Sequence, residues 1–184
     1  MFTEKISDQF FADLAKAVRR RSLTELQKES VRTILQACDT FGIERRRHVA
    51  YILATAWHES RFTPIEEIRA KPNTKVWKLQ ERYWHTGYYG RGFVQLTWLD
   101  NYRLFSRLTG KDLVNNPSDA LLPDIAAKIL VVGMRDGLFR SGHTLERYIN
   151  GDKTDYLNAR NIVNAGLFHA ERFEATAKKI IKIV

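Results

Sequence analysis

Two glutamates near a helix end have the side chains needed for acid and base chemistry on a sugar. Glu59 closes a helix-forming run, and Glu67 follows it within the same short stretch. Glycoside hydrolysis uses two carboxyl groups across a cleft, one protonated and the other ionised. On one continuous helix the two residues would be separated by about 12 Å of rise. Pro64 interrupts such a helix, so a separation of roughly 6.5–9.5 Å, with room for a water, becomes feasible.

A window rich in glycines, aromatic residues and uncharged hydrogen-bonding groups follows these glutamates, from Tyr88 to Trp98. Gly90 and Gly92 allow a sharp turn or the close approach of a ligand to the backbone. Tyr88, Tyr89 and Trp98 offer flat apolar faces with polar rims. Surfaces of this composition bind sugars, so the window is a candidate wall of the same cleft.

Spacing alone does not distinguish Glu59 and Glu67 from the other acidic residues, because a glutamate at a helix end is usually only solvated. Other kinds of site fit less well. His58-Glu59 is not a zinc motif, since position 62 is Phe rather than His. The glycines near residue 90 are not followed by the Lys-Ser/Thr pair of a phosphate loop. We therefore expect no metal and no cofactor.

Three segments together resemble the family 19 glycoside hydrolases, which include chitinases and related phage endolysins. They are Ala54–Ser60, which contains the His-Glu pair, Phe62–Glu67, and Tyr89–Thr97, which matches Tyr-Gly-Arg-Gly-X-X-Gln-Leu-Ser/Thr. Looser similarity extends from about Val31 to Phe173. The single cysteine excludes the disulfides of plant chitinases, which moves the resemblance toward the phage and bacterial branch.

The resemblance implies a role for individual residues. Glu59 would be the general acid and Glu67 the general base, with the adjacent Glu66 as an alternative base and Glu81 as a third choice. Thr97 would help Glu67 to hold the attacking water. The residues implied to bind substrate or support the acidic pair are His58, Tyr89, Gln95, Asn101, Arg160 and Asn164. Arg91 is expected to be a structural ion-pair partner.

The spacing of apolar residues predicts a mainly α protein. Helices are expected over residues 8–20, 24–42, 44–59, 100–108, 124–134, 144–149, 156–163 and 170–183. Thr24 and Gln27 fit a capping box at the start of the second of these helices. The polar segment from Lys71 to Gly87 has no clear period and is predicted to be a long loop or a short irregular β region. The resemblance implies a lysozyme-like, family 19 chitinase-like fold with a small irregular β element beside the cleft.

Length and composition favour one catalytic domain over residues 1–184, with N-terminal helices in residues 1–43 and the family 19-like core in residues 44–184. We expect no separate cell-wall-binding module. The net charge of +9 favours anionic partners. Cys38 lies in a predicted helix and is expected to be a small buried hydrophobe. No secretory signal or membrane span is recognised, so the protein is expected to stay in a host cytoplasm until another agent releases it to the cell wall.

Two hypotheses from different classes follow. The first is a bacteriolytic endolysin, a lysozyme-like muramidase that cleaves β-1,4 bonds of peptidoglycan with inversion, with a chitinase acting on N-acetylglucosamine polymers as the close alternative. It would act as a monomer, bind glycan strands and the anionic outer-membrane surface through basic faces, and bind no nucleic acid. The second is a non-enzymatic basic module that binds nucleic acid or membrane through Arg19–Arg21, Arg45–Arg47 and the lysines of the last helix, although such runs are more often solvated helix faces.

Overall fold

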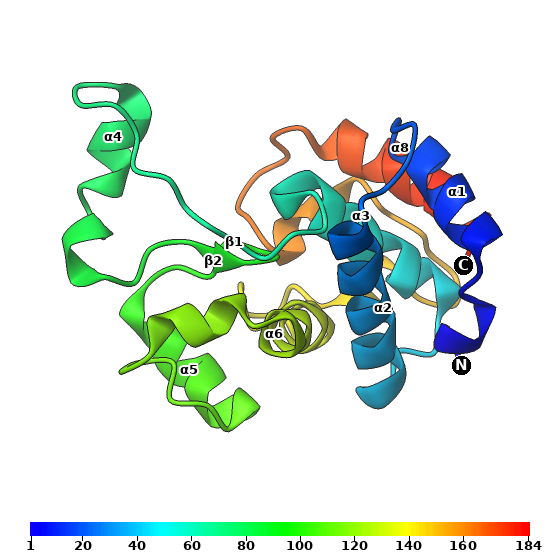
Figure 1. Ribbon diagram of the computed structural model, residues 1–184, viewed down its shortest axis with the longest axis horizontal. Coiled ribbons are helices and arrows are strands. Elements are labelled where there is room, and N and C mark those ends of the chain that lie inside the picture. Colours follow the sequence, from blue (N-terminus) through cyan, green and yellow to red (C-terminus); the bar gives the residue numbers. More distant parts are fainter.

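The computed structural model describes residues 1–184 and is mainly helical, as predicted. Two helix pairs form its body (Figure 1). Helix α3 (Arg46–Ser60) packs most extensively against α8 (Ala170–Ile180), and α2 (Glu25–Thr40) packs against α6 (Pro123–Asp136). The remaining α-helices are α1 (Asp8–Ala17), α4 (Lys75–Gln80), α5 (Leu99–Thr109) and α7 (Leu145–Tyr148). Short 3-10 helices cover Thr3–Lys5, Trp84–Thr86, Pro117–Leu121 and Asn158–Ile162.

Helix α3 lies at the centre of the fold. Every residue from His48 to Trp57 is buried, so this helix has no solvent-facing stripe before its last turn. The helix ends at Ser60, after which Arg61 adopts the left-handed conformation with φ 57° and Phe62 follows with φ 58°. This tight exit, rather than Pro64 alone, turns the chain back toward the end of the helix.

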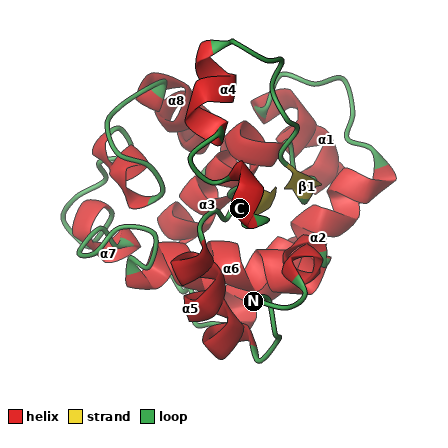
Figure 2. Cartoon of the chain, turned by 90° about the vertical axis from the view of Figure 1, so that its left-hand side faces the viewer, coloured by secondary structure: helices red, strands yellow, loops and turns green.

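A two-stranded antiparallel sheet follows α3. Strand β1 (Ile65–Glu66) pairs with β2 (Arg91–Gly92), and Glu66 lies opposite Arg91 in the register. The two strands are the only extended elements among the helices (Figure 2). This sheet confirms the small β element expected beside the candidate cleft.

Residues 68–88, here called the arm, connect the two strands and project from the helical body (Figure 1). The arm contains α4, which begins where the Thr74 side chain accepts a hydrogen bond from the Trp77 amide at 3.1 Å. The prediction of a loop or irregular β region was therefore wrong for this part of the chain. A helix of six residues is too short to show a hydrophobic period, and only its N-cap could have identified it.

One contiguous hydrophobic core joins the helices, from Phe10 in α1 to Ile180 in α8. The N-terminal helices share this core, since Leu14 and Ile34 are fully buried in it. Cys38 is also buried, as predicted. No helix combines the length and the apolar composition that a membrane crossing requires.

Local signals in the sequence agree with the structure in most places. Thr24 and Gln27 form the predicted capping box, with hydrogen bonds of 3.0 and 3.2 Å. The helix expected over residues 156–163 is instead the 3-10 helix Asn158–Ile162. Asp155 explains its start, because this carboxylate accepts hydrogen bonds from the Asn158 amide and side chain.

Candidate active site

A cavity of about 440 Å³ lies where the end of α3 meets the turn that follows β2. Glu59 enters it from α3, and the start of α5 and the segments around residues 140 and 164 complete its walls. Its lining comprises Glu59, Val94, Gln95, Leu96, Thr97, Trp98, Asn101, Phe139, Arg140, Val163, Asn164 and Ala165. Five of these are residues that the sequence singled out as catalytic or substrate-binding.

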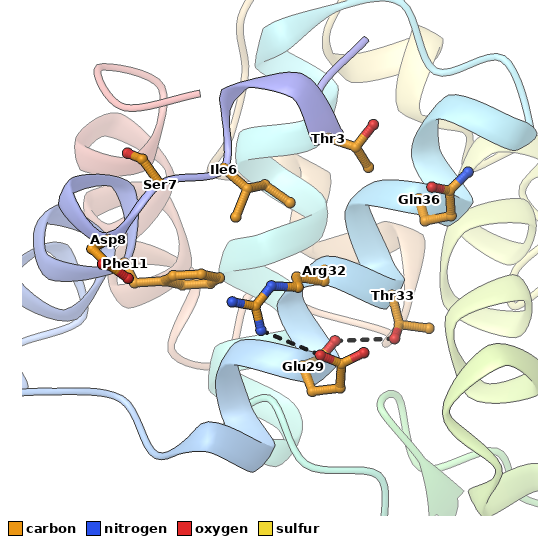
Figure 3. Close-up of a pocket in the computed structure, with 9 residues that line it drawn as sticks. All are labelled: Thr3, Ile6, Ser7, Asp8, Phe11, Glu29, Arg32, Thr33 and Gln36. Carbon is orange, nitrogen blue, oxygen red and sulfur yellow. Dashed lines mark hydrogen bonds and ion pairs between the residues drawn. The ribbon is translucent and has the colours of Figure 1, made fainter.

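A larger cavity of about 740 Å³ lies between the N-terminal segment and α2 (Figure 3), and its lining residues all come from positions 3–36. Its carboxylates, Asp8 and Glu29, are exposed, and Glu29 pairs with Arg32 at 3.2 Å. Solvent surrounds both acids, and none of the predicted site residues lines this cavity. The smaller cavity is therefore the better candidate for acid and base chemistry, although it is not the largest.

Glu59 is largely withdrawn from solvent. Its side chain is 18% exposed, and Oε1 lies 3.0 Å from Nη1 of Arg160. Burial disfavours the ionised carboxylate and raises the pKa of Glu59 above its ordinary value, although the positive charge of Arg160 acts in the opposite direction. Glu59 therefore retains a proton to higher pH than an exposed glutamate does.

Arg160 is held in place from two sides. Its guanidinium lies 4.4 Å from the centroid of the Phe173 ring, and its side chain is only 8% exposed. The 3-10 helix Asn158–Ile162 brings it to α3, so the pair with Glu59 joins distant parts of the sequence. The association of Arg160 with the acidic site is therefore present in the structure.

Glu67 occupies the opposite kind of environment. Its Oε1 accepts hydrogen bonds from Nε2 of Gln80 and the hydroxyl of Tyr83, both at 2.8 Å. Its Oε2 accepts a third from the Gly90 amide at 3.0 Å. Three donors to its two oxygens fix the orientation of this carboxyl group.

The two alternative bases are engaged elsewhere. Glu66 accepts hydrogen bonds from Nε of Arg91 at 2.9 Å and from the Tyr89 hydroxyl at 3.2 Å. Glu81 pairs with Arg69 within the arm. Arg91 is thus the ion-pair partner that the sequence suggested, and its buried guanidinium also bonds the Tyr102 hydroxyl at 3.0 Å. None of Glu66, Glu67 and Glu81 is among the residues that line the cavity, so the case for Glu67 depends on its place beside Gln95.

Gly90, which precedes β2, places Glu67 close to the Gln95 wall of the cavity. A side chain added at Gly90 would meet Gln95 Oε1 at 2.8 Å and Glu67 Oε2 at 3.2 Å, so both groups flank the same small space. Gln95 lines the cavity together with Glu59. Its Nε2 donates to the Ile65 carbonyl at 3.0 Å, which ties this wall to β1.

Thr97 and Asn101 form the next part of the same wall. The Thr97 hydroxyl donates to the Gln95 carbonyl at 2.9 Å, and the Asn101 amide donates to the Thr97 carbonyl at 2.7 Å. Each side chain keeps an oxygen available for a ligand in the cavity. Asn164 faces the cavity from a different segment and is exposed.

Two predicted cleft residues lie elsewhere. His58 lies on α3, about 100° around the helix axis from Glu59, and faces α8. Its Nε2 is 2.9 Å from the Thr176 hydroxyl, and its ring packs on Phe173. Burial lowers the pKa of His58 to about 4. Tyr89 stacks on Trp84 with ring centroids 4.3 Å apart. The expectation that His58 and Tyr89 line the cleft is therefore corrected, since neither borders this cavity.

Several residues around the site were not foreseen. Gln80 and Tyr83 hold Glu67 from the arm, whose sequence has no period to show which side chains face the body. Arg140 and Phe139 line the cavity from a turn far along the chain. The sequence shows that the arm carries hydrogen-bonding side chains, but it does not show that Glu67 is their partner.

No protein-family model matches this chain, and no curated protein sequence matches it significantly. Solved structures are similar to it. Chitinase C from Streptomyces griseus HUT6037 matches with a TM-score of 0.56 and 18% identity, over 94% of this chain and 90% of the chitinase chain. A mutant of chitinase C matches with a TM-score of 0.57 and 17% identity, over 97% and 92% of the two chains.

A bacterial family 19 chitinase is also similar, with 17% identity over 96% of this chain and 95% of the chitinase chain. Its TM-score is 0.47, so no conclusion is based on it. The two chitinase C structures match this mainly helical chain over more than nine-tenths of its length. The fold of this chain is accordingly a mainly helical, chitinase-like fold.

Proposed function

We propose that this chain is a glycoside hydrolase in which Glu59 is the general acid and Glu67 the general base. One observation carries the proposal: Glu59 in the cavity lining and Glu67 beside the Gln95 wall of that cavity have contrasting environments. Burial raises the pKa of Glu59, whereas three hydrogen-bond donors surround Glu67. Pairs of carboxyl groups with such contrasting surroundings divide the acid and base roles in glycosidases.

The proposed mechanism is a single displacement. Glu59 gives its proton to the glycosidic oxygen while the bond from that oxygen to the anomeric carbon breaks. Water attacks the same carbon from the opposite face and transfers a proton to Glu67. Thr97 assists because its hydroxyl donates to the Gln95 carbonyl and leaves its oxygen to accept a hydrogen bond from the water. The product then has the inverted anomeric configuration.

The substrate proposed is the β-1,4-linked glycan of peptidoglycan, which makes the chain a lysozyme-like endolysin that is released to the cell wall. Its net charge of +9 would favour an anionic wall polymer through steering. Arg140 supports the same choice, because it is a cation in the lining of the cavity. Chitin is the second candidate, supported by the two structurally similar proteins that are chitinases.

The alternative of a non-enzymatic basic module has less support. Arg45 pairs with Glu146 at 3.3 Å, and Arg47 donates to the Thr154 hydroxyl at 2.6 Å and to the Asn150 carbonyl at 2.7 Å. Arg46 bonds backbone carbonyls at the C-terminal end of the chain. These arginines join α3 to later segments, so they are poorly placed to bind nucleic acid as a free basic run.

The test is digestion of purified Gram-negative peptidoglycan and, separately, of chitin oligomers. Borohydride reduction and mass spectrometry would identify the new sugar ends. Muramitol ends that disappear in Glu59→Gln, but not in the exposed control Glu25→Gln, are expected for a muramidase. Cleavage of chitin alone would make the chain a chitinase, and cleavage of neither polymer would refute the hydrolase.

A further inference from the structure

The arm exposes apolar side chains that nothing in the structure covers. Ile68 is 86% exposed, Val76 55% and Leu79 51%. Val76 and Leu79 lie three residues apart on α4 and so share one face of that helix. Figure 1 places α4 at the far end of the arm, away from the helical body. Large aliphatic side chains gathered on a projecting segment indicate a contact surface.

Basic residues surround these side chains. Lys71, Lys75, Lys78 and Arg82 are all exposed, and none has an ion-pair partner. The only acidic residue of the arm, Glu81, is paired with Arg69. The arm therefore presents four uncompensated positive charges beside its apolar side chains.

Three aromatic residues of the arm, Trp77, Tyr83 and Trp84, are half-buried and contact neighbouring side chains. The Arg69 guanidinium lies 5.5 Å from the centroid of Trp77 and 4.9 Å from that of Trp84. Trp84 also stacks on Tyr89, and Tyr83 packs against Trp98. Sugars are bound by open aromatic faces, whereas aliphatic side chains beside lysines are typical of segments that enter a lipid interface.

The apolar side chains belong to one rigid unit. Nε2 of Gln80 donates to the Ile68 carbonyl at 2.9 Å, and its Oε1 accepts from the Ala70 amide at 2.7 Å. These bonds hold residues 68–70 against the end of α4. The same Gln80 side chain reaches Glu67 at 2.8 Å, so the arm connects its outer surface to the proposed active site.

We propose that the arm docks the protein on an anionic bilayer surface. Ile68, Val76 and Leu79 enter the headgroup region, while the four free cations pair with anionic lipid headgroups. Opposite charge favours this occupant over a neutral surface, since each lysine or arginine close to an anionic leaflet strengthens the attachment. The docking is distinct from glycan hydrolysis and does not depend on it.

The experiment is flotation of the whole chain with vesicles of equal parts phosphatidylglycerol and phosphatidylcholine, and with vesicles of phosphatidylcholine alone. The wild type is expected to float with the anionic vesicles only. The variant Ile68→Ser/Val76→Ser/Leu79→Ser is expected to bind them at least about tenfold more weakly, because it lacks the apolar side chains that leave water on binding. The matched variant Leu26→Ser/Leu122→Ser/Leu167→Ser alters three other exposed leucines and is expected to bind like the wild type.

A second pair of variants tests the basic residues of the arm. Both variants have the same net charge, so only the position of the lost charges differs. Substituting glutamine for the four free cations of the arm is expected to weaken binding about tenfold or more. The variant Arg20→Gln/Arg21→Gln/Lys179→Gln/Lys182→Gln loses the same charge at other exposed positions and is expected to retain most of the binding. Failure of the wild type to float, or equal loss in matched variants, would overturn the proposal. Circular dichroism checks that each variant is folded, and hydrolysis is not part of the readout.

Discussion

Glu59 owes its proposed role to two opposing effects on one carboxyl group. Burial in the cavity wall raises its pKa, and the guanidinium of Arg160 at 3.0 Å lowers it. The first effect is the larger, so the group stays protonated above the range of an ordinary glutamate. Since a general acid works only while protonated, Arg160 limits how far the upper pH boundary of the proposed activity is raised.

The variant Arg160→Met tests this balance. Removing the cation leaves burial unopposed, so the pKa of Glu59 rises further. Activity that requires protonated Glu59 is lost as the pH rises through that pKa. The alkaline limb of the kcat profile is therefore expected to move to higher pH in Arg160→Met, measured by reducing-end release across a pH series.

Arg160→Lys is the matched control, because it keeps a positive charge near Glu59. Its alkaline limb is expected to stay close to that of the wild type. An alkaline limb in Arg160→Met that is unchanged or moved to lower pH would contradict the assignment of Glu59 as the acid.

At the scale of elements, the residue that precedes β2 and the arm position the second carboxylate. The Gly90 amide, Gln80 and Tyr83 donate to Glu67, and the backbone at Gly90 passes close to Gln95. Glu67 is therefore oriented by two segments that meet only in the folded protein.

Gly90→Ala is expected to disturb this arrangement. The added methyl group would lie 2.8 Å from Gln95 Oε1 and 3.2 Å from Glu67 Oε2. The nearest atom ends a flexible side chain, so the chain should still fold while the carboxylate is displaced. We expect the hydrolysis rate to fall about tenfold to a hundredfold, since small misplacements of reacting groups are costly. Gly151→Ala, where no atom lies within 4 Å, is the control, and equal rates in both variants would refute this account.

Gly133 plays a packing role in α6. A Cβ there would overlap the ring of Phe139, which lines the cavity, and would lie 3.1 Å from the Phe105 ring. Alanine normally stabilises a helix interior by about 1 kcal/mol relative to glycine. Here overpacking is expected to dominate and to lower the free energy of unfolding by about 1–3 kcal/mol. Urea unfolding measures the sign, and a more stable Gly133→Ala protein would show that this packing is not tight.

The long helices could be predicted from the sequence because their apolar residues repeat over several turns. Thr24 and Gln27 even marked the start of α2, since a capping box is a local interaction. The six-residue α4 could not be predicted in this way, because a single turn and a half contains no period. The segment 156–163 has helical spacing, yet it forms a 3-10 turn around Asp155.

The candidate site was only partly predictable for a related reason. The motif around Gln95 is local, so the wall it forms with Thr97 and Asn101 could be expected. Whether His58 or Glu59 faces the cavity depends on the phase of α3 against α8, which a short motif does not contain. The support of Glu67 by Gln80 and Tyr83 depends on how the arm folds back.

For the whole molecule, the net charge of +9 produces the interaction that acts over the longest distance. Part of the positive charge is used internally, as in the contacts of Arg47 and Arg160. The cations Lys71, Lys75, Lys78 and Arg82 of the arm are exposed and remain available to an anionic surface. Such long-range attraction weakens within a Debye length, about 10 Å at 0.1 M salt.

Activity on peptidoglycan is therefore expected to fall as ionic strength increases. Activity on a neutral chitin oligomer should change much less over the same range, because the chemical step involves no long-range charge. Initial rates measured on both substrates across a salt series provide the comparison. Identical salt dependence on the two substrates would remove charge steering from the account.

The measurement that tests the central claim most directly is the initial rate of reducing-end release from peptidoglycan and chitin oligomers by four proteins. They are the wild type, Glu59→Gln, Glu67→Gln and Glu66→Gln. We expect the first two variants to lose about a hundredfold or more on whichever polymer the wild type cleaves, and Glu66→Gln to lose far less. A Glu59→Gln protein that is as active as the wild type would contradict the account.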